Sequence, residues 1–223
     1  MGHISQTIKS LHNSLPKGVT LVAVSKFHPN EAILEAYDAG QRIFGESRAT
    51  ELVSKAKSLP TDIKWHFIGH LQTNKVRMIM PHTSLIQSVD SERLLQLINS
   101  EAARIGRKID ILLQVHVAQE ETKFGFSPQE LISLASPGQL QKYESVRICG
   151  IMGMASNTDD INRIKDDFKA IAQTFNDIKA LNLAGNEHFT VISMGMSDDH
   201  QLAIEYGSNM VRIGSTIFGY RQY

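Results

Sequence analysis

Lys26 follows a short apolar run, Thr20–Ser25, that is typical of a buried β-strand. Because side chains alternate between the two faces of a strand, Val22, Val24 and Lys26 share one face. Partial removal from water at a strand end lowers the pKa of an amine, and a neutral lysine can attack an aldehyde to form a Schiff base. Lys26 is therefore a candidate covalent attachment site. From its position alone, a lysine that merely ends a strand and reaches solvent is the simpler alternative.

A candidate anion site lies in the last thirty residues. Residues 193–199 (SMGMSDD) contain Ser197, which stands just ahead of an expected helix, Asp198–Tyr206. Helix N-termini present unpaired N–H groups and a favourable dipole to anions, and glycine lets backbone N–H groups approach a ligand closely. The alternative is that Ser197 serves only as a helix cap.

Residues 212–216 (RIGST) add a second set of donors near the C-terminus. Gly214 and Ser215 follow the last expected strand, and β/α barrels often bind phosphate with the loops after strands seven and eight. Gly214 alone is also compatible with a simple turn. Arg212 ends an apolar strand, where a guanidinium stays charged and needs a buried partner.

The elements that must position these residues alternate along the chain. Helical spacing of apolar residues predicts helices over Asn30–Ala39, Ser91–Ile105 and Asp160–Leu181, and Ser127-Pro128 predicts the start of another. Short apolar runs predict eight strands: Thr20–Ser25, Arg42–Gly45, Trp65–Ile68, Ser84–Gln87, Asp110–His116, Val146–Met152, Phe189–Ser193 and Met210–Ile213.

This alternation predicts a single (β/α)8 TIM barrel, one domain over residues 1–223. A doubly wound open sheet is the competing fold. No Gly-x-Gly-x-x-Gly follows the first strand, which weakens a dinucleotide-binding interpretation.

Composition narrows the functional class. The 223 residues carry 23 Lys+Arg and 23 Asp+Glu, so nothing indicates nucleic acid or an anionic membrane as partner. No apolar run approaches the roughly 20 residues that span a bilayer. The one cysteine, Cys149, excludes an internal disulfide framework and is expected to be a buried structural thiol. We expect a cytoplasmic protein.

Several segments together resemble the pyridoxal 5′-phosphate (PLP) homeostasis protein family, and they occur in the family's order over nearly the whole chain. The matching segments are Ala23-Val24-Ser25-Lys26, Phe44-Gly45-Glu46, Trp65-His66-Phe67-Ile68-Gly69 with Leu71-Gln72 and Asn74-Lys75, Gly150-Ile151-Met152, residues 193–199, and Val211-Arg212-Ile213-Gly214 with Ile217-Phe218-Gly219.

The resemblance implies a barrel similar to the N-terminal domain of alanine racemase, with PLP in a Schiff base at Lys26. It implies that Arg212 faces the pyridine nitrogen and that Ser197, Gly214 and Ser215 hold the phosphate. It further implies a monomer that stores, buffers or delivers PLP, with transient contacts to PLP-dependent enzymes and no established turnover.

Two other positions belong to the expected cofactor site. Ser47 stands where the family commonly has asparagine, and its shorter hydroxyl could reach the cofactor through water. Met152 ends a strand and is expected as core or pocket wall in contact with the cofactor. Lys75 and Lys123 are each either solvated charges or part of an electropositive pocket rim.

Three functions fit Lys26. An arginine beside the pyridine nitrogen disfavours its protonation and weakens the ring as an electron sink, which favours a PLP carrier over an enzyme. The first alternative is a weak amino-acid racemase. It would need a second base, which alanine racemase takes from a separate C-terminal domain that this chain, ending at Tyr223, has no room for. The second alternative is a class I aldolase acting on a sugar phosphate.

A metal site is the remaining possibility in the sequence. His66 and His70 are four residues apart, a spacing that binds zinc on a helix, but no glutamate follows His66 and the segment is expected to be a strand running into a loop. The sequence therefore favours His66 as a packed polar residue near the barrel mouth.

Overall fold

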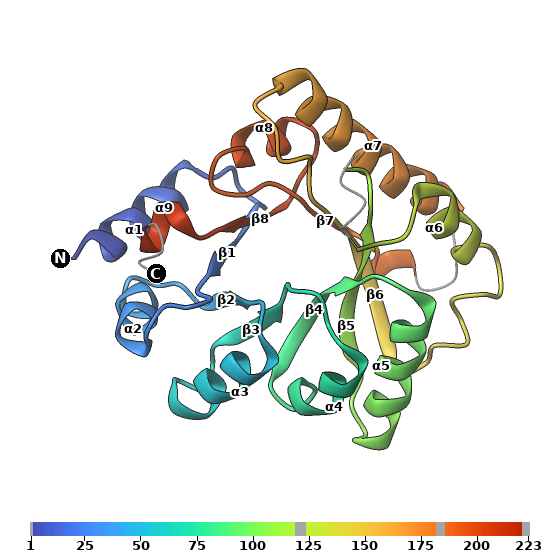
Figure 1. The fold of residues 1–223 in the computed structure, drawn as a ribbon, viewed down its shortest axis with the longest axis horizontal. Helices are drawn as coiled ribbons and strands as arrows, with labels where there is room; N and C mark the ends of the chain where they lie inside the picture. The colour runs from blue at the N-terminus through green and yellow to red at the C-terminus, as the bar shows by residue number, and fades with distance from the viewer. Residues whose placement is uncertain (1, 119–123, 182–185, 220–223) are drawn as a thin grey trace.

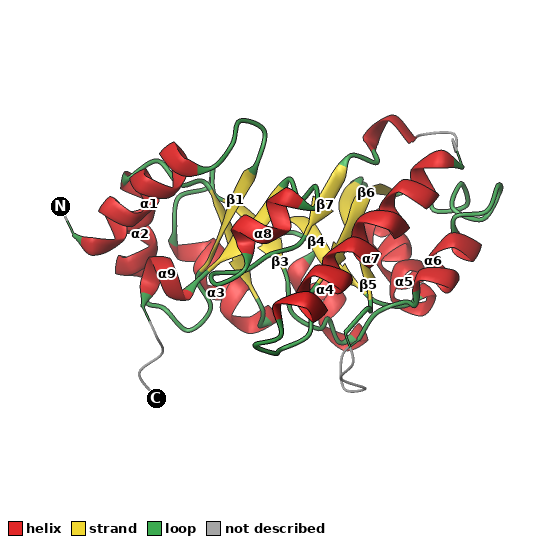
Figure 2. Cartoon of the chain, turned by 90° about the horizontal axis from the view of Figure 1, so that it is seen from above, coloured by secondary structure: helices red, strands yellow, loops and turns green. Residues whose placement is uncertain are grey.

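In the computed structural model, the described residues, 2–118, 124–181 and 186–219, form a closed parallel barrel in which each strand pairs with the next and β8 pairs with β1 (Figure 1). Helices alternate with the strands and cover the outside of the barrel (Figure 2). The strands are β1 Thr20–Val24, β2 Ile43–Glu46, β3 Lys64–Phe67, β4 Thr83–Val89, β5 Ile109–Val115, β6 Val146–Gly153, β7 Val191–Ser193 and β8 Met210–Ile213.

The α-helices precede or follow these strands and lie against their outer faces. They are α1 His3–Ser14, α2 Asn30–Asp38, α3 Ala49–Ser58, α4 Val76–Ile79, α5 Glu92–Arg104, α6 Pro128–Leu134, α7 Ile161–Ala180, α8 His200–Glu205 and α9 Ser215–Phe218, with 3-10 turns at Thr73–Lys75 and Asn186–His188.

Strand alternation divides the apolar residues into two clusters. Val22, Leu85, Leu112, Met152 and Met210 pack in the barrel interior, whereas their neighbours along the strands pack outward against the helices. Buried layers of this kind close a small barrel, and they leave the C-terminal ends of the strands as the place where polar side chains gather.

The prediction of a (β/α)8 barrel is confirmed, and each predicted strand is present. The largest strand difference is in β4, which runs from Thr83 to Val89 and so extends beyond its predicted range at both ends. Strand β7 begins at Val191, and Phe189 ahead of it stacks on Phe175 of α7, with ring centroids 4.9 Å apart. Helix α8 begins at His200, two residues after the start of its predicted segment. Ser127 caps α6 as predicted, in a capping box with Glu130.

Cys149 differs from the fully buried thiol that its apolar neighbours predict. It is half-buried in β6, and burial raises the pKa of its thiol, which keeps it protonated at neutral pH. Within the described part of the chain, no helix has the length and apolar character needed to cross a membrane.

Candidate cofactor site at the barrel mouth

A cavity of about 490 Å³ opens at the C-terminal ends of the strands. Its volume lies in the usual range for sites that bind small molecules and cofactors. The loops after β1, β2, β3, β6, β7 and β8 contribute to its wall. The lining residues are Val24, Lys26, His28, Ser47, Ile68, Met154, Met196, Ser197, Asp198, Arg212, Gly214, Ser215 and Gly219.

Lys26 reaches this cavity from a tight turn at the end of β1. The strand ends at Val24, and the N–H of His28 donates to the carbonyl oxygen of Ser25 at 3.1 Å, which closes a four-residue turn. Lys26 is partly buried and lines the cavity, two residues beyond the strand. Predicted alternation is thus confirmed on β1, with Val22 in the interior, Val24 in the wall and Lys26 at the mouth.

The loops after β7 and β8 meet at one corner of the cavity. The N–H of Gly214 donates to Ser197 Oγ at 3.2 Å, so the two segments that the sequence singled out are in direct contact. Gly195 lets the loop after β7 pack closely on α8: its φ is +92°, and a Cβ there would lie 2.6 Å from the Cβ of Ala203. With Ser215 beside them, these groups form a corner rich in hydrogen-bond donors, as an anion requires.

Arg212 brings a buried positive charge to the same cavity. Its Nη1 donates to the carbonyl oxygen and the Oγ of Ser193 at 2.9 and 2.7 Å, and its Nη2 donates to the carbonyl oxygen of Gly153 at 3.0 Å. Among the described residues, its hydrogen bonds go to uncharged oxygens. Burial lowers the pKa of Arg212 to about 10, the charge of Asp199 opposes this shift, and the guanidinium remains charged at neutral pH.

A chain of polar side chains crosses the barrel interior behind Arg212. Ser193 Oγ donates to Gln87 Oε1 at 2.7 Å, and Gln87 Nε2 lies 3.0 Å from His66 Nδ1. Burial lowers the pKa of His66 to about 3, which keeps the imidazole neutral and able to accept from Gln87. This series of hydrogen bonds orients Ser193 Oγ to accept from Arg212, and it holds His66 inside the barrel as a packed polar residue.

The fold brings together Lys26, Ser47, Ser197, Arg212, Gly214 and Ser215, six of the seven residues expected at the cofactor. Met152 is not among the lining residues: it is buried one layer deeper, in the interior cluster, and Met154 lines the cavity in its place. The lining residues that the sequence did not single out include His28, Ile68, Met196 and Asp198. For His28, its position two residues after Lys26 was an available signal.

An adjoining cavity of about 280 Å³ shares Ser47 with the first and is lined by cationic side chains. Arg48 and Lys75 both line it, so Lys75 lies beside the cofactor cavity and not in it. His70 also lines it, with its Nδ1 2.8 Å from Asp90 and its ring stacked on Phe124. Lys123 lies outside the described residues.

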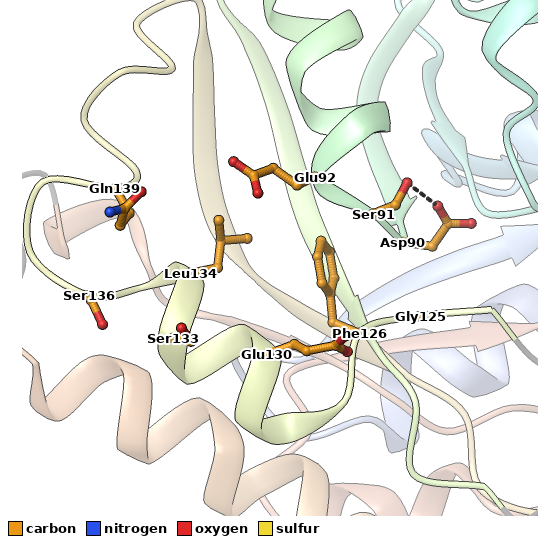
Figure 3. A pocket seen from close by; sticks show the side chains of 10 residues that line it. All are labelled: Asp90, Ser91, Glu92, Gly125, Phe126, Glu130, Ser133, Leu134, Ser136 and Gln139. Carbon is orange, nitrogen blue, oxygen red and sulfur yellow. Dashed lines mark hydrogen bonds between the residues drawn. The ribbon is translucent and has the colours of Figure 1, made fainter.

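A third cavity, of about 690 Å³, lies on the flank between the start of α5 and α6 and has the opposite character (Figure 3). Asp90, Glu92 and Glu130 surround it. Hydrogen bonds from Tyr143 and Lys142 lower the pKa of Glu92, and the backbone N–H of Ser127 lowers that of Glu130, so both are ionised at neutral pH. This acidic cavity would repel a phosphate.

Comparison with known proteins first identifies the broad family to which this barrel belongs. The model of the alanine racemase N-terminal domain matches residues 1–222, so the chain belongs to that family. Alanine racemase of Enterococcus faecalis shares the fold, with a TM-score of 0.73 at 18% identity over 98% of this chain and 58% of that one.

Relatives of higher identity then define the narrower family. The chain is 38% identical over 208 residues to the PLP homeostasis protein of Schizosaccharomyces pombe, covering 92% of this chain and 85% of that one. It is 39% identical over 214 residues to the human protein of the same name, covering 91% and 77%. The chain belongs to the PLP homeostasis protein family.

A solved structure shows the same barrel at similar identity. PipY of Synechococcus elongatus, with PLP bound, has a TM-score of 0.88 and 36% identity over 97% of this chain and all of that one. Its structure without PLP has a TM-score of 0.91. The family that the sequence motifs indicated is therefore confirmed.

Proposed function

We propose that this protein binds PLP as a Schiff base on Lys26 and takes part in PLP homeostasis as a carrier, not as an enzyme. The observation that carries the proposal is the charge of Arg212, which is buried in the same cavity as Lys26 and, among the described residues, is hydrogen-bonded only to uncharged oxygens. Its charge would favour an anionic ligand in the cavity, its guanidinium would donate to a ring nitrogen, and Lys26 would supply the amine that an aldehyde requires.

The cavity fits PLP by the chemistry of its donors. Gly214, Ser215 and Ser197 would hold the phosphate at the corner between the last two strands, and Arg212 would face the pyridine nitrogen. Ser47 and Met154 would line the sides of the ring. PipY, 36% identical, is described with PLP bound, which supports the same ligand here.

The chemistry that bound PLP supplies is electron withdrawal from an attached amine, and this depends on protonation of the pyridine nitrogen. Arg212 holds three hydrogen bonds to fixed oxygens and stays charged, so it would oppose a proton on the facing nitrogen. A weakened electron sink suits storage and transfer of the cofactor better than turnover. The relatives are named for homeostasis, which supports the same conclusion.

We further propose that residues 1–223 act as one PLP-binding domain, as a cytoplasmic monomer in transient contact with PLP-dependent enzymes. These points rest on the single closed barrel, on the balanced charge and on the family.

The test is borohydride reduction of the purified protein with PLP, followed by peptide mass mapping. We expect a pyridoxyl adduct on the peptide that contains Lys26, and its loss in Lys26→Ala. Lys75→Ala is the matched control, because Lys75 lines the adjoining cavity, and it should retain the adduct on Lys26. An adduct spread over exposed lysines, or retained in Lys26→Ala, would contradict the proposal.

A further inference from the structure

The residue after Lys26 has an unusual backbone conformation. Phe27 is the one non-glycine residue with positive φ, +69°, among the residues that the structure describes. It occupies the third position of the Ser25–His28 turn, where a positive φ normally selects glycine or asparagine. A bulky side chain is strained in this region, and such strain persists only where the surroundings impose it.

Glu51 of α3 is the group that holds this conformation. The N–H of Phe27 donates to Glu51 Oε1 at 2.6 Å, a short hydrogen bond to a charged acceptor across 24 residues of sequence. Arg48, one turn earlier, lies over the Phe27 ring at 4.4 Å from its centroid. Both contacts come from the start of α3, so this helix determines the backbone that presents Lys26.

Lys55, on the next turn of α3, fixes Glu51 to the start of the same turn. Lys55 is nearly fully buried, and its Nζ donates to Glu51 Oε1 at 2.6 Å, to Glu46 Oε1 at 2.8 Å and to the carbonyl oxygen of Ser25 at 2.8 Å. These contacts use all three donors of an ammonium group. Ser25 Oγ donates to Glu46 at 2.6 Å, so the first and third residues of the turn are attached to one network around Lys55.

We propose that Glu51, held by Lys55, is a positioning residue for Lys26: it keeps Phe27 in the left-handed region and thereby directs Lys26 into the cavity. This inference rests on the proposed function of Lys26. If Glu51 only stabilised the packing of α3 against the barrel, replacing Phe27 by glycine would not compensate for the loss of Glu51. If Glu51 positions the turn, glycine at position 27 replaces much of what Glu51 does, because glycine adopts a positive φ without steric cost.

The first measurement needs no PLP. Amide hydrogen exchange at Phe27, followed by NMR, reports the hydrogen bond to Glu51 directly. We expect Glu51→Ala to accelerate this exchange by about tenfold or more, because a bond to a charged acceptor is lost. Glu51→Gln keeps a carbonyl oxygen in place and should retain most of the protection. Unchanged exchange in Glu51→Ala overturns the inference whether or not the protein binds PLP.

The second measurement is the rate at which the Lys26 adduct forms, trapped with borohydride at successive times after PLP is added. We expect Glu51→Ala to slow adduct formation by about tenfold, since a bond of this kind corresponds to at least one factor of ten in an equilibrium. Adding Phe27→Gly to Glu51→Ala should recover most of the rate. A double variant that is no faster than Glu51→Ala overturns the positioning role.

Glu101 provides a matched control for lost stability. Its buried carboxylate on α5 accepts from Arg77 at 2.8 Å and from Arg104 at 2.6 Å, and it does not line the cavity of Lys26. Glu101→Ala should lower the melting temperature and leave the rate of adduct formation unchanged. If it slows the adduct as much as Glu51→Ala does, the effect is global and the inference is overturned. If wild-type protein forms no adduct on Lys26, the proposed function fails, and the exchange at Phe27 still decides the role of Glu51.

Discussion

The cofactor cavity at the barrel mouth and the acidic cavity on the flank differ in how their charges are compensated. At the mouth, the buried guanidinium of Arg212 donates its hydrogen bonds, among the described residues, to uncharged oxygens, and the charge of Asp199 acts on it without a hydrogen bond. On the flank, Glu92 and Glu130 are each bound by donors of their own neighbourhood, namely Lys142 with Tyr143 and the N-terminus of α6. The carboxylates of the larger cavity thus have donors of their own, whereas the positive charge in the smaller cavity favours an anionic ligand. Because the larger cavity is acidic, volume alone does not identify the candidate cofactor site.

Arg212→Ala should have the largest effect, because it removes the charge that distinguishes the mouth cavity from the flank cavity. It removes the buried positive charge and the hydrogen bonds that Arg212 donates to the carbonyl oxygens of Ser193 and Gly153. Loss of a hydrogen bond from a charged group predicts about a hundredfold weaker PLP binding, measured by titration of Schiff-base absorbance. Equal PLP affinity in Arg212→Ala would remove the basis for distinguishing the two cavities.

His66 gives the mouth a pH dependence of stability that begins near pH 6.5, above the range in which the flank carboxylates Glu92 and Glu130 titrate. Its pKa is about 3 in the folded protein against 6.5 when exposed, so the unfolded state binds the extra proton first as pH falls. The stabilising contribution is complete above pH 6.5 and is lost progressively toward pH 3, by about 1.4 kcal/mol per pH unit at most. The free energy of unfolding, measured with urea at several pH values from 7 to 4, should change less with pH in His66→Asn than in the wild type. An equal change with pH in both proteins would contradict burial of a neutral imidazole.

Ser197→Ala tests whether the corner between the loops after β7 and β8 binds the phosphate of the ligand. The substitution removes the hydroxyl that accepts from Gly214, together with one donor to the phosphate. We expect about tenfold weaker binding of PLP, the magnitude of one hydrogen bond to a charged group, with little change in melting temperature. Pyridoxal, which has no phosphate, is the control ligand, and its affinity should not change. An equal loss for both ligands would place the effect outside the phosphate site.

Ser127→Ala should have the smallest effect and should be confined to the flank. Ser127 Oγ accepts from the N–H of Glu130 at 3.2 Å in the capping box of α6. Loss of such a cap costs about 1 kcal/mol of stability, which thermal unfolding would detect. PLP affinity should stay at the wild-type value. A change in affinity would show that the two cavities are coupled.

The sequence determined the features that depend on local pattern. Period-two alternation placed Lys26 at the end of β1, and the sustained strand–helix order predicted the closed barrel. A barrel brings the C-terminal ends of its strands together, so residues near positions 26, 197 and 212 were expected in one place before any coordinate was known. These features can be predicted from the sequence because the alternation of side chains depends only on the local geometry of the strand.

How deep in the barrel a side chain on a given strand face lies depends on the tertiary structure. Met152 in β6 and Met154, one residue beyond the end of that strand, are two positions apart, and alternation cannot say which of them reaches the cavity. Strand register fixes Met152 beside Gln114 and Ser193, inside the barrel, which leaves Met154 at the wall.

Contacts between distant segments were also decided by the tertiary structure alone. Glu51 reaches Phe27, Gln87 links Ser193 to His66, and Gly214 meets Ser197. No periodicity encodes these pairs, because each depends on the register and stagger with which the closed barrel brings separate strands together. Local patterns in the sequence predict which reactive side chains the chain carries and at which end of the barrel they lie. Only the closed barrel surrounds Arg212 with the oxygens of Ser193 and Gly153 and brings Glu51 against the turn that carries Lys26.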